Sequence, residues 1–513
     1  MTHLFSKHEL TELATPYPDR ITGHIRRKEI DRALSVCDEM RESRILLHDY
    51  FADSCTVLWS WIGDRLGEDS IEKLFRYVFK QSAERQYYEV ADAQVMPHLT
   101  VFLLAKSWRA HSCFGVGPYP AKFRITEDHD KFTFHLEPCA SGARLWKKGW
   151  YEEGKGGRVS GSEHPWTYNR KGFPYYCIHC PFLNEILPYE SGYGMIMWPV
   201  DPLNSPEDPC AWHIYKNPCN VPETYYKRLK LNRKPKKMRL AKTRTDLIFD
   251  PVELKEMARP ITDRISENLV KGKLKEASKL CKEVRDEFLT LHDLYAMMIL
   301  ATYSFIAEQM GEEALGEALE NQFNRCLKHP VLSTIETMPL TQKISFLATK
   351  IFGADHCNST GYHPGRFSIQ ETDKEIQFIL DPCGSGGRLI QAGAYEPMPF
   401  LKRLREKVEN KAVNLIAQNI PLPEALLKMA FPLIVTHFTQ RKSYSQGKTK
   451  KAFSWSFNQK DTPYYCCQCG KIAEKMRNKG LTIIPPAGKK DVCVWKLSKT
   501  EPESEKSVER NDS

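Results

Sequence analysis

The stretch LEPCASGARL at residues 136–145 returns as LDPCGSGGRL at residues 380–389. The separation is 380 − 136 = 244 residues. The same offset joins LHD at residues 47–49 to LHD at residues 291–293. Landmarks that recur at one offset over about 100 residues indicate an internal repeat. We therefore predict a tandem duplication of one module.

The register of the repeat changes further along the chain. PYYC at residues 174–177 returns as PYYC at residues 463–466, an offset of 463 − 174 = 289. The second copy has therefore gained 289 − 244 = 45 residues, in a segment near 390–445 that is predicted to be helical and to form a lid or a partner surface. The predicted units are a first repeat module over 1–226, a basic linker over 227–260, a second repeat module over 261–498 and a disordered tail over 499–513.

Each copy begins with helical spacing and continues with candidate strands. Apolar residues three and four positions apart predict helices over 29–44 and 48–66, with counterparts over 273–287 and 292–310. Candidate strands lie at 122–126, 131–136, 194–198, 211–215, 366–370, 375–380, 481–484 and 492–497. Helices followed by antiparallel strands, twice over, predict an α+β fold.

The composition is that of an ordinary globular protein, apart from its cysteines. Of 513 residues, 41% are hydrophobic and 27% are charged, and no apolar run approaches the roughly 20 residues of a membrane span. The first residues lack a basic segment followed by an apolar stretch, so we expect no secretory signal and a cytoplasmic location. Sixteen cysteines in that location indicate metal binding, catalysis or buried packing rather than disulfides.

The formal net charge of +10 is concentrated in one short segment. Ten Lys and Arg residues lie between Lys227 and Arg244, and no acidic residue interrupts them. Such a run can bind nucleic acid or anionic lipid. Its place between the two copies favours a solvated linker instead. We therefore expect neither a nucleic-acid partner nor a membrane.

Cysteines at metal-ligand spacing are the strongest chemical signal in the sequence. Cys177 and Cys180 form a CxxC pair, which Cys466 and Cys469 repeat. Two thiolates at this spacing can hold one metal ion, and zinc suits thiolate ligands. The residues expected to complete the two sites are Cys139 and Cys210 in the first copy and Cys383 and Cys493 in the second, with Cys113 and Cys357 as further options. The alternatives are iron, an iron–sulfur cluster, a redox dithiol, or buried thiols without a ligand role.

The repeated loop that contains Cys139 has a second candidate role. Its small residues allow backbone amides to approach an anion, and Arg144 offers a bidentate fork for a carboxylate or phosphate. The candidate substrate-binding residues are Ser141 and Arg144 in the first copy and Gly384, Ser385, Gly386 and Arg388 in the second. Cys383 is also a candidate nucleophile, activated by the nearby arginine. The alternative is a tight turn whose arginine forms a salt bridge within the fold.

His48 and His292 stand near the start of the two most apolar predicted helices. A histidine there is a candidate catalytic base or metal ligand, because it titrates near neutral pH. Adjacent residues on a helix point about 100° apart, so Asp49 is not expected to orient His48 as a catalytic triad would. The aspartate is expected instead to stabilise the helix N-terminus.

The motifs that are missing narrow the function. The sequence contains no P-loop, no dinucleotide-binding glycine motif, no HExxH and no GxSxG. We predict a zinc–thiolate enzyme that hydrolyses, cleaves or transfers a group of a small anionic organic substrate. A non-catalytic ligand-binding module with structural zinc and a CxxC redox protein are the alternatives. Helices followed by a Cys-bearing antiparallel β unit resemble small-molecule sensor domains that hold zinc through scattered cysteines. The two copies are expected to pack as a pseudo-dimer, and a homo-oligomer is an open possibility.

Overall fold

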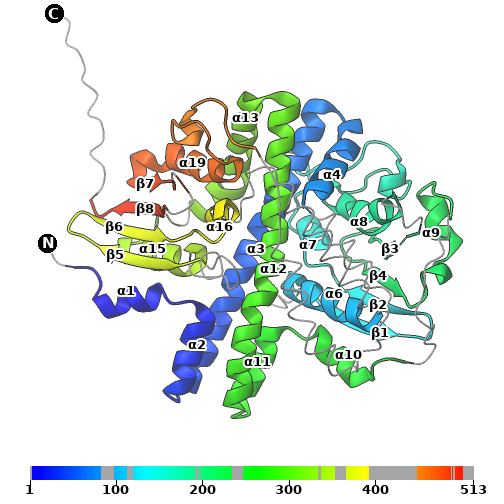
Figure 1. The fold of residues 1–513 in the computed structure, drawn as a ribbon, viewed down its shortest axis with the longest axis horizontal. Coiled ribbons are helices and arrows are strands. Elements are labelled where there is room, and N and C mark those ends of the chain that lie inside the picture. The colour runs from blue at the N-terminus through cyan, green and yellow to red at the C-terminus, as the bar shows by residue number, and fades with distance from the viewer. Residues whose placement is uncertain are drawn as a thin grey trace, which may run out of the picture.

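Two long helices pass side by side through the centre of the molecule in this computed structural model (Figure 1). They are α3 over Ile30–Leu66 and α12 over Leu274–Met310. The structure describes residues 3–82, 97–112, 119–190, 195–196, 198–233, 247–332, 335, 337–352, 365–391, 447–486, 488 and 491–500. The fold of these residues mixes helices with two small antiparallel sheets, which confirms the α+β class.

Each central helix continues through the point where the sequence predicted a boundary. The predicted helices over 29–44 and 48–66 form a single helix, because the Ile45-Leu46-Leu47 segment between them contains no glycine or proline. The same holds for α12. Both helices stop at a glycine with positive φ, Gly67 at +80° and Gly311 at +93°, a conformation that glycine adopts without strain.

Two shorter helices complete a four-helix unit at one end of the molecule. Helix α2 over Tyr17–Arg26 packs on α3, and α11 over Ile261–Val270 packs on α12. Their shared core contains the fully buried Cys37 and Cys281. These two thiols therefore serve as packing residues.

The first sheet lies on one side of the central pair. It consists of β1 (Phe123–Glu127), β2 (Lys131–Leu136), β3 (Val200–Asp201) and β4 (Cys210–Tyr215), in the order β1-β2-β4-β3. The predicted hairpin is confirmed. The strand expected over 194–198 is found instead at Val200–Asp201, where it pairs with Trp212 and Ala211.

The second sheet lies on the other side and has the corresponding strand order. It consists of β5 (Phe367–Glu371), β6 (Glu375–Leu380), β7 (Leu481–Ile484) and β8 (Cys493–Ser498), in the order β5-β6-β8-β7. Leu380 pairs with Cys493 in this sheet, as Leu136 pairs with Cys210 in the first. Cys210 therefore begins β4 and Cys493 begins β8, each opposite the last residue of the neighbouring hairpin strand.

The remaining helices surround this frame. They are α4 (Asp69–Ser82), α6 (Pro97–Ser112), α7 (Gly142–Lys147), α8 (His179–Pro181), α9 (Glu223–Arg228), α13 (Glu312–Gln322), α15 (Leu340–Phe346), α16 (Gly386–Gln391) and α19 (Tyr464–Met476). The short helices α7 and α16 each follow a hairpin directly, and each contacts a central helix, through Arg144 and Asp49 of α3 and through Arg388 and Asp293 of α12.

One helix near the start of each half of the chain crosses to the sheet of the other half. Helix α1 (Lys7–Leu13) packs on β5, and its Leu10 joins the core of the second sheet. Helix α10 (Pro251–Ala258) packs on β1, and its Leu254 and Ala258 join the core of the first sheet. Each sheet is thus covered by a helix that belongs to the other half of the chain.

A buried glutamate holds each crossing segment in place. Glu371, at the end of β5, accepts hydrogen bonds from the amides of Leu4 (2.7 Å) and Phe5 (3.1 Å). Glu127, at the end of β1, accepts hydrogen bonds from the amides of Ile248 (2.7 Å) and Phe249 (3.0 Å). The carboxylates are neutralised by Lys499 at 2.5 Å and Lys216 at 2.8 Å, respectively.

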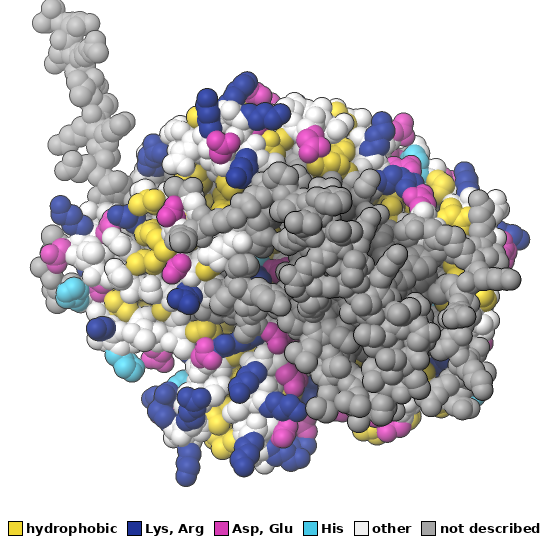
Figure 2. All heavy atoms as spheres, in the orientation of Figure 1, with side chains coloured by type: hydrophobic (Ala, Val, Ile, Leu, Met, Phe, Trp, Pro, Cys, Tyr) yellow, Lys and Arg dark blue, Asp and Glu magenta, His cyan; other side chains and the backbone are white. Residues whose placement is uncertain are grey.

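Two features of the described residues concern the surface charge and the most apolar helix. Lys and Arg side chains gather at the lower end of the molecule, where α2 and α11 end and Arg26, Lys28 and Lys271 are exposed (Figure 2). Helix α12 is long and apolar enough to cross a membrane, but 88% of its most apolar window is buried inside the fold.

Some predictions fall on residues that the structure leaves undescribed. Most of the helical insertion near 390–445 and most of the disordered tail over 499–513 lie there, as does a large part of the basic run. The predicted linker over 227–260 also contains α10, which packs on the first sheet. The insertion, its partner surface and the tail stay predictions.

Candidate functional site

Four cysteines from three segments line one cavity beside the first sheet. Cys139 lies in the loop between β2 and α7, Cys177 and Cys180 lie around the start of α8, and Cys210 begins β4. We call these four residues the first cysteine cluster. The cavity is also lined by His179. The structure thus places the four cysteines predicted for the first site around one cavity.

The size of this cavity limits what it can contain. Its volume is about 20 Å³. Roughly 10–15 Å³ is sufficient for one water molecule. The space therefore accepts a single small ion or a water molecule, and an organic substrate does not fit in it.

Electrostatics set the condition for these thiols to ionise. Burial raises the pKa of Cys177, and the neighbouring Cys139 raises it further. Burial likewise raises the pKa of Cys210, with further increases from Cys139 and Cys177. Like charges in a poorly hydrated pocket oppose one another. The cluster can ionise as a group only when a cation shares the cavity.

The loop between β2 and α7 is shaped to receive sulfur. Burial raises the pKa of Cys139. The backbone amides of Ser141, Gly142 and Ala143 donate hydrogen bonds to its sulfur and partly oppose this rise. A Cβ atom on Gly142 would lie only 2.6 Å from Sγ of Cys177. The glycine is therefore required for the second thiol to approach the loop.

The second cysteine cluster repeats much of this arrangement. It contains Cys383, Cys466, Cys469 and Cys493. Burial raises the pKa of Cys466, and Cys383 and Cys493 raise it further. A Cβ atom on Gly386 would lie 2.8 Å from Sγ of Cys466. The same close approach of thiol to loop is present beside both sheets.

The four thiols of the first cluster line one cavity, but a shared cavity is not yet a metal site. Within the described part of the chain, no group of three or more His, Cys, Asp or Glu side chains has the arrangement of a metal site. Cys113 and Cys357 lie outside that part. Zinc, iron and iron–sulfur binding therefore stay predictions.

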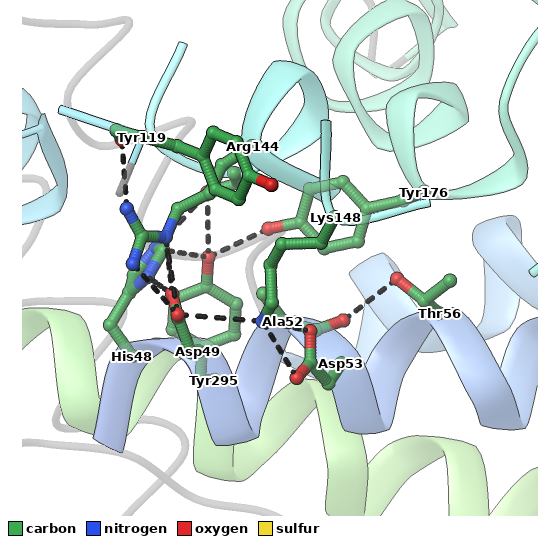
Figure 3. A network of polar contacts seen from close by, with 11 residues as sticks. His48, Asp49, Ala52, Asp53, Thr56, Tyr119, Arg144, Lys148, Tyr176 and Tyr295 are labelled. Carbon is green, nitrogen blue, oxygen red and sulfur yellow. Dashed lines mark hydrogen bonds and ion pairs between the residues drawn. The ribbon is translucent and has the colours of Figure 1, made fainter. Parts of the chain in front are cut away.

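His48 belongs to a buried polar network next to the first cluster (Figure 3). Its Nε2 lies 3.1 Å from Oγ of Ser141, and its Nδ1 lies 3.3 Å from Oδ1 of Asp49. We expected that Asp49 would not orient His48 and would instead stabilise a helix N-terminus, but Asp49 lies inside α3 and its carboxylate contacts the ring. His48 and Ser141 are 2% and 1% exposed, so both are enclosed by protein.

Tyr295 of α12 completes this network from the other half of the chain. Its hydroxyl lies 3.3 Å from Oγ of Ser141, 3.5 Å from Nε2 of His48 and 2.7 Å from the hydroxyl of Tyr176. Tyr176 directly precedes Cys177. The network therefore links both central helices to the first cysteine cluster.

His292 makes the corresponding contacts beside the second cluster. Its Nε2 lies 2.8 Å from Oγ of Ser385, and its Nδ1 lies 3.1 Å from Oδ1 of Asp293. The ring packs edge-on against Phe51 of α3, with centroids 5.5 Å apart. Phe51 takes the place that Tyr295 has in the first network but brings no hydroxyl.

The two candidate substrate-binding arginines are paired within the fold. Arg144 donates to both oxygens of Asp49 at 2.9–3.1 Å and to the carbonyl of Tyr119 at 2.8 Å. Arg388 donates to Asp293 at 2.8 Å. Both therefore match the alternative of a turn whose arginine forms an internal salt bridge. Gly384, the remaining candidate in that loop, accepts a hydrogen bond from Arg388 through its carbonyl at 3.3 Å.

Lys148 adds a second cation to the first network (Figure 3). Its Nζ lies 3.0 Å from both oxygens of Asp53 and 3.4 Å from Asp49. Burial raises the pKa of Asp53 to about 6, against the opposing effect of Lys148. Burial would also raise the pKa of Asp49, but hydrogen bonds with His48 and Arg144 and the charge of Lys148 hold it well below its usual range.

Sequence reasoning missed Tyr295, Lys148 and Asp53. The sequence contained a partial signal for Asp53 and Lys148, because Asp53 follows Asp49 by four residues and Lys148 follows Arg144 by four. That spacing places each pair on one face of a helical segment, but it does not say which segments meet. Tyr295 gave no signal, because it reaches the first network from the second half of the chain.

No family model, curated protein or solved structure matches this chain.

Proposed function

We propose that this chain is a zinc protein in which each cysteine cluster holds one ion in a closed structural site. The observation that carries the proposal is the convergence of Cys139, Cys177, Cys180 and Cys210 on a cavity with room for one ion. Thiolates favour zinc, and four protein ligands leave no open position for a substrate. This is the non-catalytic alternative from the sequence, and we prefer it to the enzyme.

The position of the clusters supports a structural role. Each cluster joins the loop after a hairpin, the next strand of the same sheet and the segment with the CxxC motif. These elements are distant in sequence, so an ion that binds all of them opposes their separation. Metal binding of this kind contributes directly to the free energy of folding.

We also propose that the chain arose by duplication. The supporting observations are the corresponding strand orders of the two sheets, the pairing of Leu136 with Cys210 and of Leu380 with Cys493, and the two crossing helices. In this proposal the two halves pack as a single-chain counterpart of a swapped dimer.

The contact between Ser141 and His48 favours a second candidate, which is a hydrolase with a serine nucleophile. The line from Asp49 through His48 to Ser141 has the order of a catalytic triad. It requires access to Ser141, whose exposed fraction is 1%. A fluorophosphonate probe tests it: labelling of wild-type protein but not of Ser141→Ala would support a hydrolase.

Elemental analysis of the purified chain tests the structural-zinc proposal. About two zinc ions per chain are expected, with no visible absorption. A Cys139→Ser/Cys177→Ser variant should lose one ion, and Cys383→Ser/Cys466→Ser should lose the other. Cys219, which is exposed and outside both clusters, provides the control variant Cys219→Ser. Metal-free, fully folded protein with reactive thiols would contradict the proposal and favour a redox dithiol.

A further inference from the structure

His179 distinguishes the two cysteine clusters. It lies between Cys177 and Cys180 and lines the same cavity as the four thiols. The corresponding residue between Cys466 and Cys469 is Gln468. The first cavity therefore has an imidazole that the second cluster lacks at the matching position.

The hydrogen bond of the ring fixes which nitrogen faces the thiols. Nδ1 of His179 lies 2.5 Å from the backbone carbonyl of Tyr176. A carbonyl can only accept, so Nδ1 carries the proton and Nε2 presents a lone pair. Metal-bound histidines characteristically donate their other N–H to a carbonyl or carboxylate in this way. The ring also packs edge-on against Tyr176, with centroids 4.9 Å apart, which restricts its rotation.

The distance from this lone pair to sulfur suits a shared ion. Nε2 of His179 lies 3.5 Å from Sγ of Cys180. Zinc–sulfur and zinc–nitrogen bonds of about 2.3 and 2.05 Å at a tetrahedral angle place the two ligands about 3.5–3.6 Å apart. The two atoms therefore already have the separation that one tetrahedral ion would impose.

Gln468 has a different task in the second cluster. Its Oε1 accepts a hydrogen bond from the hydroxyl of Tyr50 at 3.0 Å. Tyr50 belongs to α3, so Gln468 joins the CxxC segment to a central helix. An amide oxygen is also a poorer ligand than imidazole for zinc among thiolates.

We infer that His179 is a metal ligand, so that the first site binds its ion through sulfur and one imidazole nitrogen while the second binds through sulfur alone. The inference rests on the proposed zinc function and adds to it that the two sites differ. The first cavity is lined by five potential donors and a tetrahedral ion uses four, so the first site can exchange a thiolate for the imidazole. The second cluster has Gln468 at the matching position and therefore no imidazole there.

Cadmium substitution followed by ¹¹³Cd NMR tests the inference on the whole chain. We expect two cadmium resonances, one typical of all-sulfur coordination and one shifted upfield by a nitrogen ligand. With ¹⁵N-labelled histidine, the upfield resonance should show coupling to one imidazole nitrogen. His179→Gln, which copies the second cluster, should move the upfield resonance to the all-sulfur region or abolish it, and leave the other unchanged.

The outcomes separate this inference from the zinc proposal. Two all-sulfur resonances without nitrogen coupling, unchanged by His179→Gln, would show that Cys180 merely shares a hydrogen bond with the ring and would overturn the inference alone. Failure of both clusters to bind cadmium would overturn the zinc proposal and the inference together. If His179→Gln does not fold, the nitrogen coupling in the wild-type protein decides.

Discussion

At the scale of single residues, Gly142 stands where the loop after β2 meets the thiol of Cys177. A Cβ atom there would lie 2.6 Å from Sγ, so Gly142→Ala must displace the sulfur or the loop. We expect the loss of one zinc ion and a decrease in unfolding free energy of about 1–3 kcal/mol, typical of overpacking. Zinc content and the urea midpoint measure the two effects.

The matched control is Gly23→Ala, in the middle of α2. The added Cβ first meets Nη1 of Arg27 at 3.5 Å, an ordinary contact. This variant should keep both ions and gain about 0.5–1 kcal/mol from helix propensity. If Gly142→Ala keeps both ions and the wild-type midpoint, the packing of Cys177 against the loop is not needed for metal binding.

Asp53 should make stability depend on pH. Its pKa rises from 3.8 to about 6 on folding, so the folded state binds this proton more tightly than the unfolded state does. The resulting stabilisation is complete below pH 3.8 and is lost as pH rises through about 6. Asp53→Asn removes the titrating carboxyl group and with it this pH dependence. The variant keeps the ion pair between Lys148 and Asp49.

Urea unfolding of Asp53→Asn and wild type at pH 4.5 and pH 8 measures the effect. The difference between a pKa of 3.8 and one of about 6 corresponds to about 3 kcal/mol over the whole titration, and about 2 kcal/mol of it falls between pH 4.5 and pH 8. The variant should therefore gain about 2 kcal/mol relative to wild type as the pH rises from 4.5 to 8. Comparison at each pH cancels the titration of other groups. Parallel pH profiles for the two proteins would mean that Asp53 is ionised throughout this range.

At the scale of elements, the crossing helices depend on two buried carboxylates. Glu371→Gln should weaken the anchoring of Leu4 and Phe5 and leave Lys499 without its charge partner. We expect a loss of about 1–3 kcal/mol. Hydrogen exchange should rise in α1 and β5. Glu127→Gln is the matched variant, and its effect should fall on α10 and β1 instead.

The sequence predicted where helices and strands form better than it predicted which of them pack together. Local sequence pattern is sufficient to predict the hairpin over 122–136, the helix ends at Gly67 and Gly311, and the cysteines at corresponding positions of the two halves. The crossing of α1 and α10 does not, because an amphipathic pattern says that a helix has an apolar face and leaves open which sheet receives it. Tyr295 was missed for the same reason.

At the scale of the whole molecule, the two halves interlock. Each sheet is covered by a helix from the other half, and the central helices α3 and α12 pack on each other. Residues of α12, including Tyr295, Ile299 and Tyr303, belong to the core around the first sheet. A chain cut between the halves therefore separates surfaces that are buried in the intact protein.

This interlocking predicts that neither half folds alone. Fully burying one large apolar side chain contributes about 1.5–3 kcal/mol, so losing a few of them removes much of the roughly 5–15 kcal/mol that stabilises a domain. Fragments 1–246 and 247–513, expressed separately, should lack cooperative thermal unfolding. Co-expressed, they should co-purify through a tag on one fragment and bind both zinc ions. The control is the full chain cut at a protease site inserted within 234–246, which should stay assembled. A cooperative transition in fragment 1–246 alone would show that the first sheet needs neither α10 nor α12.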